Sequence, residues 1–178
     1  MNIFYLHEDP KTCAEMHCDK HVVKMILEYA QLLSTAHRIL DGDEWADRVG
    51  LYKATHKNHP SAIWARESAG NYVWLNKLFQ ELCKEYTKRY VRTHTTQLKL
   101  ADKLCVLPKY LNVDYKDFNL GFTEPPQCMD DYCKVEGNTI MAYRNYYIKE
   151  KSYMARWKFT QEPIWYTIGM ACEMKGAA

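Results

Sequence analysis

The chain contains 178 residues, of which 47% are hydrophobic, 13% aromatic and 26% charged. A chain of this size and composition can bury a core without disulfide bonds, so we expect a soluble globular protein of about one domain. Its 24 basic and 22 acidic residues leave a formal charge of +2, which excludes a heavily charged tail protein. The 14 tyrosines and five tryptophans either pack a core or stack on a flat ligand.

Neither secretion nor membrane insertion is expected. The first residues, Met1 to His7, have no positively charged region and no long apolar run. No other segment approaches the roughly 18 consecutive apolar residues that a membrane span needs. The seven cysteines form no C-x-x-C pair, which favours reduced thiols and a cytoplasmic location, in the host cytoplasm if the protein is viral. Nothing in the sequence indicates an oligomeric state.

The clearest element is an amphipathic helix from about residue 16 to residue 40. Apolar residues recur along it at intervals of three and four, and Asp41-Gly42-Asp43 ends it. One polar stripe follows the same spacing and comprises His17, His21, Lys24, Glu28, Gln31, Thr35 and Arg38. Because the rest of the circumference is nearly all apolar, we expect a helix buried on most sides, with this stripe facing solvent or a cleft.

Three further helices are predicted, over residues 60–90 with a bend near Gly70, residues 95–105 and residues 135–154. Prolines and glycines punctuate residues 106–133, which predicts a long ordered loop, and such loops are often functional. The predicted fold class is therefore all-α: a single compact helical domain over residues 1–170 with a long ordered loop before the last helix. Residues 171–178 are expected to form a frayed C-terminal tail.

The polar stripe has two interpretations. Glu28 has Lys24 one turn away and His21 two turns back, which places a carboxylate, an amine and an imidazole on one surface. In a cleft that excludes water, Glu28 or Lys24 could carry a proton or act as a nucleophile. Alternatively, the stripe is a solvated face with an ordinary Lys24–Glu28 ion pair. Two histidines and a glutamine are unusual on a face whose only role is solubility.

A second candidate site lies where a loop meets the helix that starts at Pro60. The N-terminus of a helix attracts anions, and His56, Asn58 and His59 would reinforce a phosphate site there. The simpler alternative is a helix cap with exposed histidines. A metal-dependent nuclease or phosphohydrolase would need a cluster drawn from His17, His21, His56, His59 and Glu28, but the H-E-x-x-H signature is absent. We therefore assign no metal ligand and no cofactor.

A third candidate is a basic, aromatic region near the C-terminus. Residues 134–158 contain six basic and two acidic residues, a local charge of +4. Basic side chains among aromatic rings suit a nucleic-acid backbone and unstacked bases, although aromatic residues at helical spacing are more often core. The candidate DNA-binding residues over the whole chain are His17, Gln31, His56, Asn58, Arg66, Arg144, Lys149, Trp165 and Tyr166.

Four short segments follow one another along most of the chain: Met1-Asn2-Ile3-Phe4-Tyr5-Leu6-His7, Asp19-Lys20-His21 with Glu28 nine residues after Asp19, Asn58-His59-Pro60, and Glu162-Pro163-Ile164-Trp165-Tyr166. In this order they resemble motifs of the small all-helical pyrimidine-dimer DNA glycosylases of phages and bacteria. The second segment matches the family's Asp-Gln-His and catalytic Glu without a gap. At the positions of the family's DNA-binding arginines, this sequence has Ile3, Leu27 and Gln31.

The resemblance implies a glycosylase or abasic-site lyase that acts on a damaged or modified base, with double-stranded DNA as its partner and no cofactor. In that family the α-amino group of the chain forms a Schiff base with the deoxyribose C1′, while the Glu stabilises the sugar cation and a base is flipped out. The resemblance assigns the carboxylate role to Glu28 and the nucleophile to the Met1 amine. Lys24 is the alternative nucleophile because it lies one turn from Glu28, and His21 and His59 are expected to be polar groups of the cleft. A metal-dependent nuclease and a non-catalytic nucleic-acid-binding protein stay open as alternatives.

Overall fold

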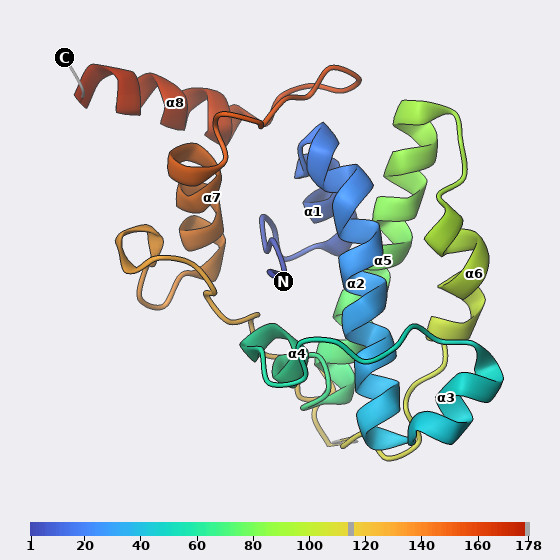
Figure 1. Cartoon of the computed structure of the whole chain (residues 1–178). Coiled ribbons are helices and arrows are strands. Elements are labelled where there is room, and N and C mark those ends of the chain that lie inside the picture. Colours follow the sequence, from blue (N-terminus) through green and yellow to red (C-terminus); the bar gives the residue numbers. More distant parts are fainter. Residues whose placement is uncertain (114–115, 177–178) are drawn as a thin grey trace.

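The computed structural model describes residues 1–113 and 116–176, and this part of the chain is all helical (Figure 1). Its α-helices and one short 3₁₀ helix are α1 (Pro10–Met16), α2 (Asp19–Leu40), α3 (Asp43–Val49), α4 (Pro60–Trp64), α5 (Ala69–Tyr90), α6 (Thr95–Leu104), η1 (Asp131–Cys133), α7 (Thr139–Glu150) and α8 (Ile164–Gly176). No β-strand occurs within the described residues. The predicted all-α class is confirmed, and a long loop precedes α7, in which η1 is the only helix among the described residues. Helix α7 is not the last helix as predicted, because α8 follows it.

The two long helices α2 and α5 form the centre of the molecule. They pack on each other, α1 also packs on α5, and α6 lies beside them (Figure 1). The apolar positions predicted for α2 are buried: Val22, Met25, Ile26, Tyr29, Leu32, Leu33 and Ala36 are at most 1% exposed. The N-terminal segment runs between this central pair and α7 (Figure 1). One side of α2 therefore faces the beginning of the chain rather than another helix.

One predicted helix begins later than expected and another is divided. Helix α2 begins at Asp19 rather than near residue 16, and it is preceded by the short helix α1, which was not predicted from the sequence. The Asp9 carboxylate accepts a hydrogen bond from the Thr12 amide at 2.8 Å and caps α1. The predicted helix over residues 60–90 breaks between α4 and α5. Ser68 caps α5, and a Cβ on Gly70 would lie only 2.3 Å from the Asn119 carbonyl oxygen. Because Gly70 has no side chain, the long loop can lie directly against the start of α5.

The C-terminal residues differ from the prediction. Helix α8 continues to Gly176, although a frayed tail was expected from residue 171, and residues 177–178 lie outside the described residues. Helix α8 packs on α7. Its first turn is anchored by Tyr166, whose ring centroid lies 4.7 Å from that of Trp157. This packing gives α8 the tertiary support that short helices need. None of the described helices is both long enough and apolar enough to span a bilayer.

Candidate active site

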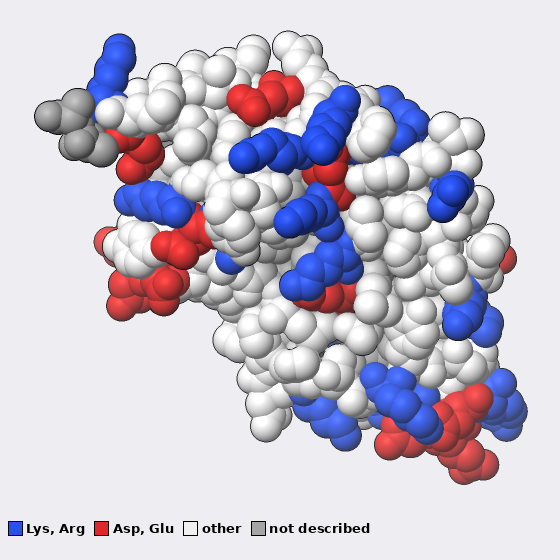
Figure 2. Space-filling model, turned by 45° about the horizontal axis from the view of Figure 1, so that its top comes forward, with Lys and Arg blue, Asp and Glu red and all other residues white. Residues whose placement is uncertain are grey.

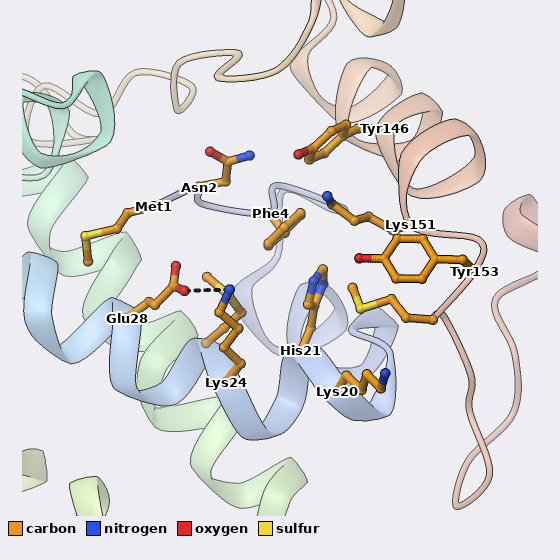
Figure 3. A pocket seen from close by; sticks show the side chains of 12 residues that line it. Met1, Asn2, Phe4, Lys20, His21, Lys24, Glu28, Tyr146, Lys151 and Tyr153 are labelled. Carbon is orange, nitrogen blue, oxygen red and sulfur yellow. Dashed lines mark ion pairs between the residues drawn. The ribbon is translucent and has the colours of Figure 1, made fainter.

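A pocket of about 340 Å³ lies between α2, the N-terminal segment and the end of α7 (Figure 3). Three parts of the chain line it: Met1, Asn2 and Phe4; Lys20, His21, Lys24, Met25 and Glu28; and Tyr146, Lys151, Tyr153 and Met154. The polar stripe of α2 therefore faces a pocket along the stretch that carries His21, Lys24 and Glu28. Four of the five predicted catalytic residues, His21, Lys24, Glu28 and Met1, therefore line the same pocket, and His59 does not.

The pocket is positively charged. Lys20, Lys24 and Lys151 line it together with Met1, whereas Glu28 is the one carboxylate among its lining residues. Figure 2 shows basic side chains gathered in the middle of one face of the molecule, with a few acidic atoms among them. Such a surface attracts a polyanion, and DNA phosphates bind to lysine side chains in this way.

Glu28 and Lys24 differ in their environments although they form an ion pair. The Lys24 Nζ atom lies 3.1 Å from the Glu28 Oε1 atom, and the Glu28 side chain is 16% exposed while that of Lys24 is 68% exposed. The carboxylate is thus set into the wall of the pocket, and the ammonium reaches outward over it (Figure 3). Both interpretations of the stripe hold in part, since the ordinary ion pair exists and Glu28 is also shielded from water.

A buried chain of hydrogen bonds fixes the N-terminal segment beside Glu28. The Phe4 amide donates to the Tyr29 hydroxyl oxygen at 3.2 Å, and this oxygen lies 2.9 Å from His17 Nε2. His17 Nδ1 lies 2.7 Å from the Cys13 carbonyl oxygen. Because a carbonyl can only accept, Nδ1 carries the imidazole proton and Nε2 accepts from Tyr29. Tyr29 follows Glu28 on α2, so this chain holds the first residues of the protein next to the carboxylate.

His17 should make folding sensitive to acid. Burial lowers the pKa of His17 to about 4, whereas a histidine in the unfolded chain has a pKa of about 6.5. Below pH 6.5 the unfolded state therefore binds a proton that the folded state does not, and stability falls as the pH falls toward 4. Between pH 7 and pH 5 this contributes a loss of about 2 kcal/mol in the free energy of unfolding.

Urea unfolding of the wild type and of His17→Gln at both pH values measures this contribution. We expect the loss on acidification to be about 2 kcal/mol smaller in the variant. His56→Gln is the matched control because His56 is exposed, and it should show the wild-type loss. An equal loss in all three proteins would contradict the prediction.

His21 joins the three walls of the pocket. Its Nδ1 atom lies 2.5 Å from the hydroxyl oxygen of Tyr147 on α7, and its ring stacks on Phe4 with centroids 4.1 Å apart. Burial lowers the pKa of His21 well below its usual value, and the positive charges of Lys151 and Lys24, together with that of His17 when it is protonated, act in the same direction. His21 is therefore a neutral group that packs α2 against the N-terminal segment and α7 and also lines the pocket.

His59 lines an adjoining hollow that shares Tyr146 with the pocket. Its Nδ1 atom accepts a hydrogen bond from the Ser61 amide at 3.1 Å and caps α4. Its pKa is lowered, first by burial and then by the positive charge of the Met1 amine, while the Glu28 carboxylate opposes the shift. His59 therefore lies within electrostatic range of both groups, although it does not line the pocket itself.

Four of the residues predicted to bind DNA take part in internal packing. His17 is fully buried and Tyr166 is 4% exposed. Arg144 donates from Nε and Nη2 to the Leu6 carbonyl oxygen at 3.2 and 2.9 Å, and its guanidinium lies over the Trp165 ring. His17, Arg144, Trp165 and Tyr166 therefore make contacts inside the protein. The other candidates line no part of the pocket: Gln31, His56, Asn58, Arg66 and Lys149.

The sequence did not single out Lys20, Lys151 or Tyr153 as site residues. Lys20 follows Asp19 on α2 and lies beside the predicted stripe, so helical geometry alone could have suggested it. Lys151 and Tyr153 lie in the turn after α7, and only the packing of α7 across the N-terminal segment brings them to the pocket. Their local signal was the excess of basic and aromatic residues over residues 134–158.

The ligand set of the metal-dependent alternative is not assembled. Among residues 1–113 and 116–176, no three His, Cys, Asp or Glu side chains are grouped so that they could hold a metal ion. His17 uses both ring nitrogens in the buried hydrogen-bond chain, and His21 uses Nδ1 with Tyr147. His17, which caps the end of α1, and His21 on α2 therefore serve the packing around the pocket.

One comparison with known proteins finds a matching family. A family model described as pyrimidine dimer DNA glycosylase matches residues 1–98, which is more than half of the chain. No curated protein and no solved structure matches the chain. The matched residues include the N-terminal segment and all of α2, and so Met1, His21, Lys24 and Glu28. The chain belongs to the pyrimidine dimer DNA glycosylase family.

Proposed function

We propose that this protein releases a damaged or modified base from DNA, with the α-amino group of Met1 as nucleophile and Glu28 as the catalytic carboxylate. Membership of the family supports a DNA glycosylase-type function with DNA as the substrate. The observation that carries the assignment is that Met1 and Glu28 line one positively charged pocket. The lysines around it supply the contacts to phosphate that hold the strand.

The proposed reaction begins at the deoxyribose C1′. The neutral amine of Met1 attacks C1′, and the electrons of the glycosidic bond leave with the base, which takes up a proton. The Glu28 carboxylate stabilises the positive charge that develops on the sugar and accepts the proton that the amine loses. The C1′–O4′ bond then breaks as O4′ takes the proton from Glu28, which opens the sugar ring and leaves a protonated imine between Met1 and C1′. Loss of a C2′ proton then expels the 3′ phosphate, and water hydrolyses the imine and regenerates the amine.

Met1 is a better candidate for the nucleophile than Lys24. Reference α-amino groups lose their proton at about pH 7.7–8.0 and lysine side chains at about pH 10.4, so a chain terminus supplies far more neutral amine near pH 7. A lysine becomes an adequate nucleophile when it is desolvated, but the Lys24 side chain is 68% exposed and paired with Glu28. We assign to Lys24 the role of orienting the carboxylate and contacting phosphate.

Borohydride trapping on a duplex with one abasic site tests this proposal. We expect the wild type to form a covalent adduct, and peptide mapping to place the adduct on Met1. Lys24→Met should still form the adduct, whereas a protein acetylated at its N-terminus should not. A wild type that forms no adduct and releases no base from any lesion would refute the proposed function. An adduct on a lysine would refute the assignment of Met1.

A further inference from the structure

One wall of the pocket lies outside the part of the chain that the family model matches. Met1, Lys24 and Glu28 fall within residues 1–98, whereas Tyr146, Lys151, Tyr153 and Met154 come from the end of α7 and the turn after it. In Figure 3 this second wall, which we call the tyrosine wall and define by Tyr146, Lys151 and Tyr153, stands across the pocket from Met1 and Glu28. The reacting groups and the tyrosine wall therefore face the same space.

The inner part of the tyrosine wall is held in place by a series of rings. The Tyr146 ring is nearly parallel to Phe4, with an interplanar angle of 11° and centroids 6.2 Å apart. Phe4 in turn stacks on His21. The Lys151 Nζ atom lies 4.5 Å from the centroid of the Tyr146 ring, which is close enough for a cation–π interaction. This arrangement keeps a positive charge at the edge of the pocket.

The outer part of the wall is an open aromatic ring. Tyr153 lines the pocket, yet it is 75% exposed. Large aromatic side chains usually bury most of their surface. An exposed ring beside lysines is the arrangement by which proteins bind unstacked bases, because every base has a face that can stack and the lysines hold its phosphate.

We propose that the tyrosine wall binds the base of the reacting nucleotide, with Tyr153 stacked on the face of the base and Lys151 bound to the adjacent phosphate. The inference rests on the proposed function and adds to it the residues that select the base. If C1′ lies between the Met1 amine and Glu28, the base attached to C1′ must occupy the rest of the pocket, and the wall opposite is the tyrosine wall. The pocket volume of about 340 Å³ lies within the usual range for small ligands.

Two substrates, one with the base still attached to the reacting sugar and one without it, separate this role from general binding of DNA. One is a duplex with a single cyclobutane thymine dimer, on which cleavage of the glycosidic bond is measured, because the cyclobutane ring keeps the detached base joined to its neighbour. The other is the same duplex with an abasic site already formed, on which the rate of borohydride adduct formation is measured. Tyr153→Leu keeps an apolar side chain but has no aromatic face. We expect its loss on the dimer to exceed its loss on the abasic site by about tenfold.

Two further variants serve as controls. Tyr153→Phe keeps the aromatic ring and, unlike Tyr153→Leu, should cleave the glycosidic bond of the dimer at close to the wild-type rate. Tyr110→Leu removes a tyrosine that is 65% exposed and also lies beside a lysine, Lys109, but lines no part of the pocket. It should affect neither reaction. Equal losses on the two substrates for Tyr153→Leu, or no loss on either, would overturn the inference.

A binding measurement covers the case in which the wild type forms the abasic-site adduct but does not act on the dimer. The two probes are duplexes that carry either 2-aminopurine or a tetrahydrofuran abasic analogue at one position, opposite a second abasic analogue. We expect the wild type to bind the 2-aminopurine duplex about tenfold more tightly, and Tyr153→Leu to lose this preference. No preference in the wild type would overturn the inference, whereas a wild type that forms no covalent adduct and acts on no lesion would refute the proposed function first.

Discussion

Replacing Glu28 with glutamine is expected to lower the rate of base release by about 10²–10⁴-fold, the range over which a positioned acid–base group contributes to an enzymatic rate. Glutamine has nearly the same shape, but it cannot stabilise the sugar cation with a negative charge and cannot accept the proton of the amine. Single-turnover kinetics on a duplex with one lesion measure this loss directly. Trapping on an abasic site should slow as well, because imine formation also requires proton transfer.

The remaining properties of Glu28→Gln should change little. The Lys24–Glu28 ion pair has one largely exposed partner, and such pairs contribute about 0–1 kcal/mol to stability. Affinity for a duplex with a tetrahydrofuran analogue should be kept or increased, because the substitution removes the negative charge from a pocket surrounded by lysines. Glu44→Gln on α3 is the matched control, since Glu44 is exposed and lines no part of the pocket. A rate for Glu28→Gln within about threefold of the wild type would contradict a role that is worth at least 10²-fold.

One wall of the pocket could be predicted from the sequence because one helix builds it. Residues three or four apart lie on the same face of a helix, so the spacing of His21, Lys24 and Glu28 already placed them together. The opposite wall could not be predicted in this way. Tyr146 and Tyr153 are more than 100 residues away along the chain, and their approach depends on how α7 packs across the N-terminal segment. The sequence indicated their chemistry but not their position.

The burial of individual residues in the predicted polar stripe could not be predicted from the sequence either. His17 has the helical spacing of Glu28 in the sequence, but it lies before the start of α2 and is fully buried, with Tyr29 and the Cys13 carbonyl bonded to its two ring nitrogens. Likewise, Arg144 was predicted to bind DNA from local charge, but it is bound to the Leu6 carbonyl oxygen, 138 residues away in the sequence. Polar side chains that pair with distant backbone groups have the same local pattern as polar side chains that face a ligand.

Arg89 is another polar side chain whose burial the sequence does not reveal. Its replacement is expected to cause a large loss of stability. Its guanidinium is fully buried and lies 3.1 Å from Asp19 Oδ1 and 3.1 Å from Glu85 Oε1. It also donates to the carbonyl oxygens of His17 at 2.8 Å and Glu15 at 3.0 Å. Arg89→Leu would leave two buried carboxylates without this partner. We expect the free energy of unfolding to fall by about 3–5 kcal/mol, the usual cost of breaking a buried ion pair on one side.

Urea unfolding at neutral pH measures this loss, and Arg92→Leu is its control. Arg92 lies three residues further along and is exposed, so its replacement should change the stability by less than about 0.5 kcal/mol. Arg89→Lys should fall between the two, because an ammonium keeps the charge but cannot reproduce the planar fork of donors. A loss for Arg89→Leu as small as that for Arg92→Leu would show that the buried cluster does not stabilise the fold.

The loss at Arg89 should extend to the pocket, because the Asp19 carboxylate connects its two walls. Asp19 is the first residue of α2, which carries Glu28, and its Oδ2 atom accepts a hydrogen bond at 2.7 Å from the amide of Lys158. Its own amide donates to the Arg156 carbonyl oxygen at 2.8 Å. The segment after α7 that contains Lys151 and Tyr153 is thereby tied to the start of α2. At temperatures where Arg89→Leu is still folded, we therefore expect weaker binding of base-containing substrates together with the lower stability, whereas Glu28→Gln should lose the rate alone.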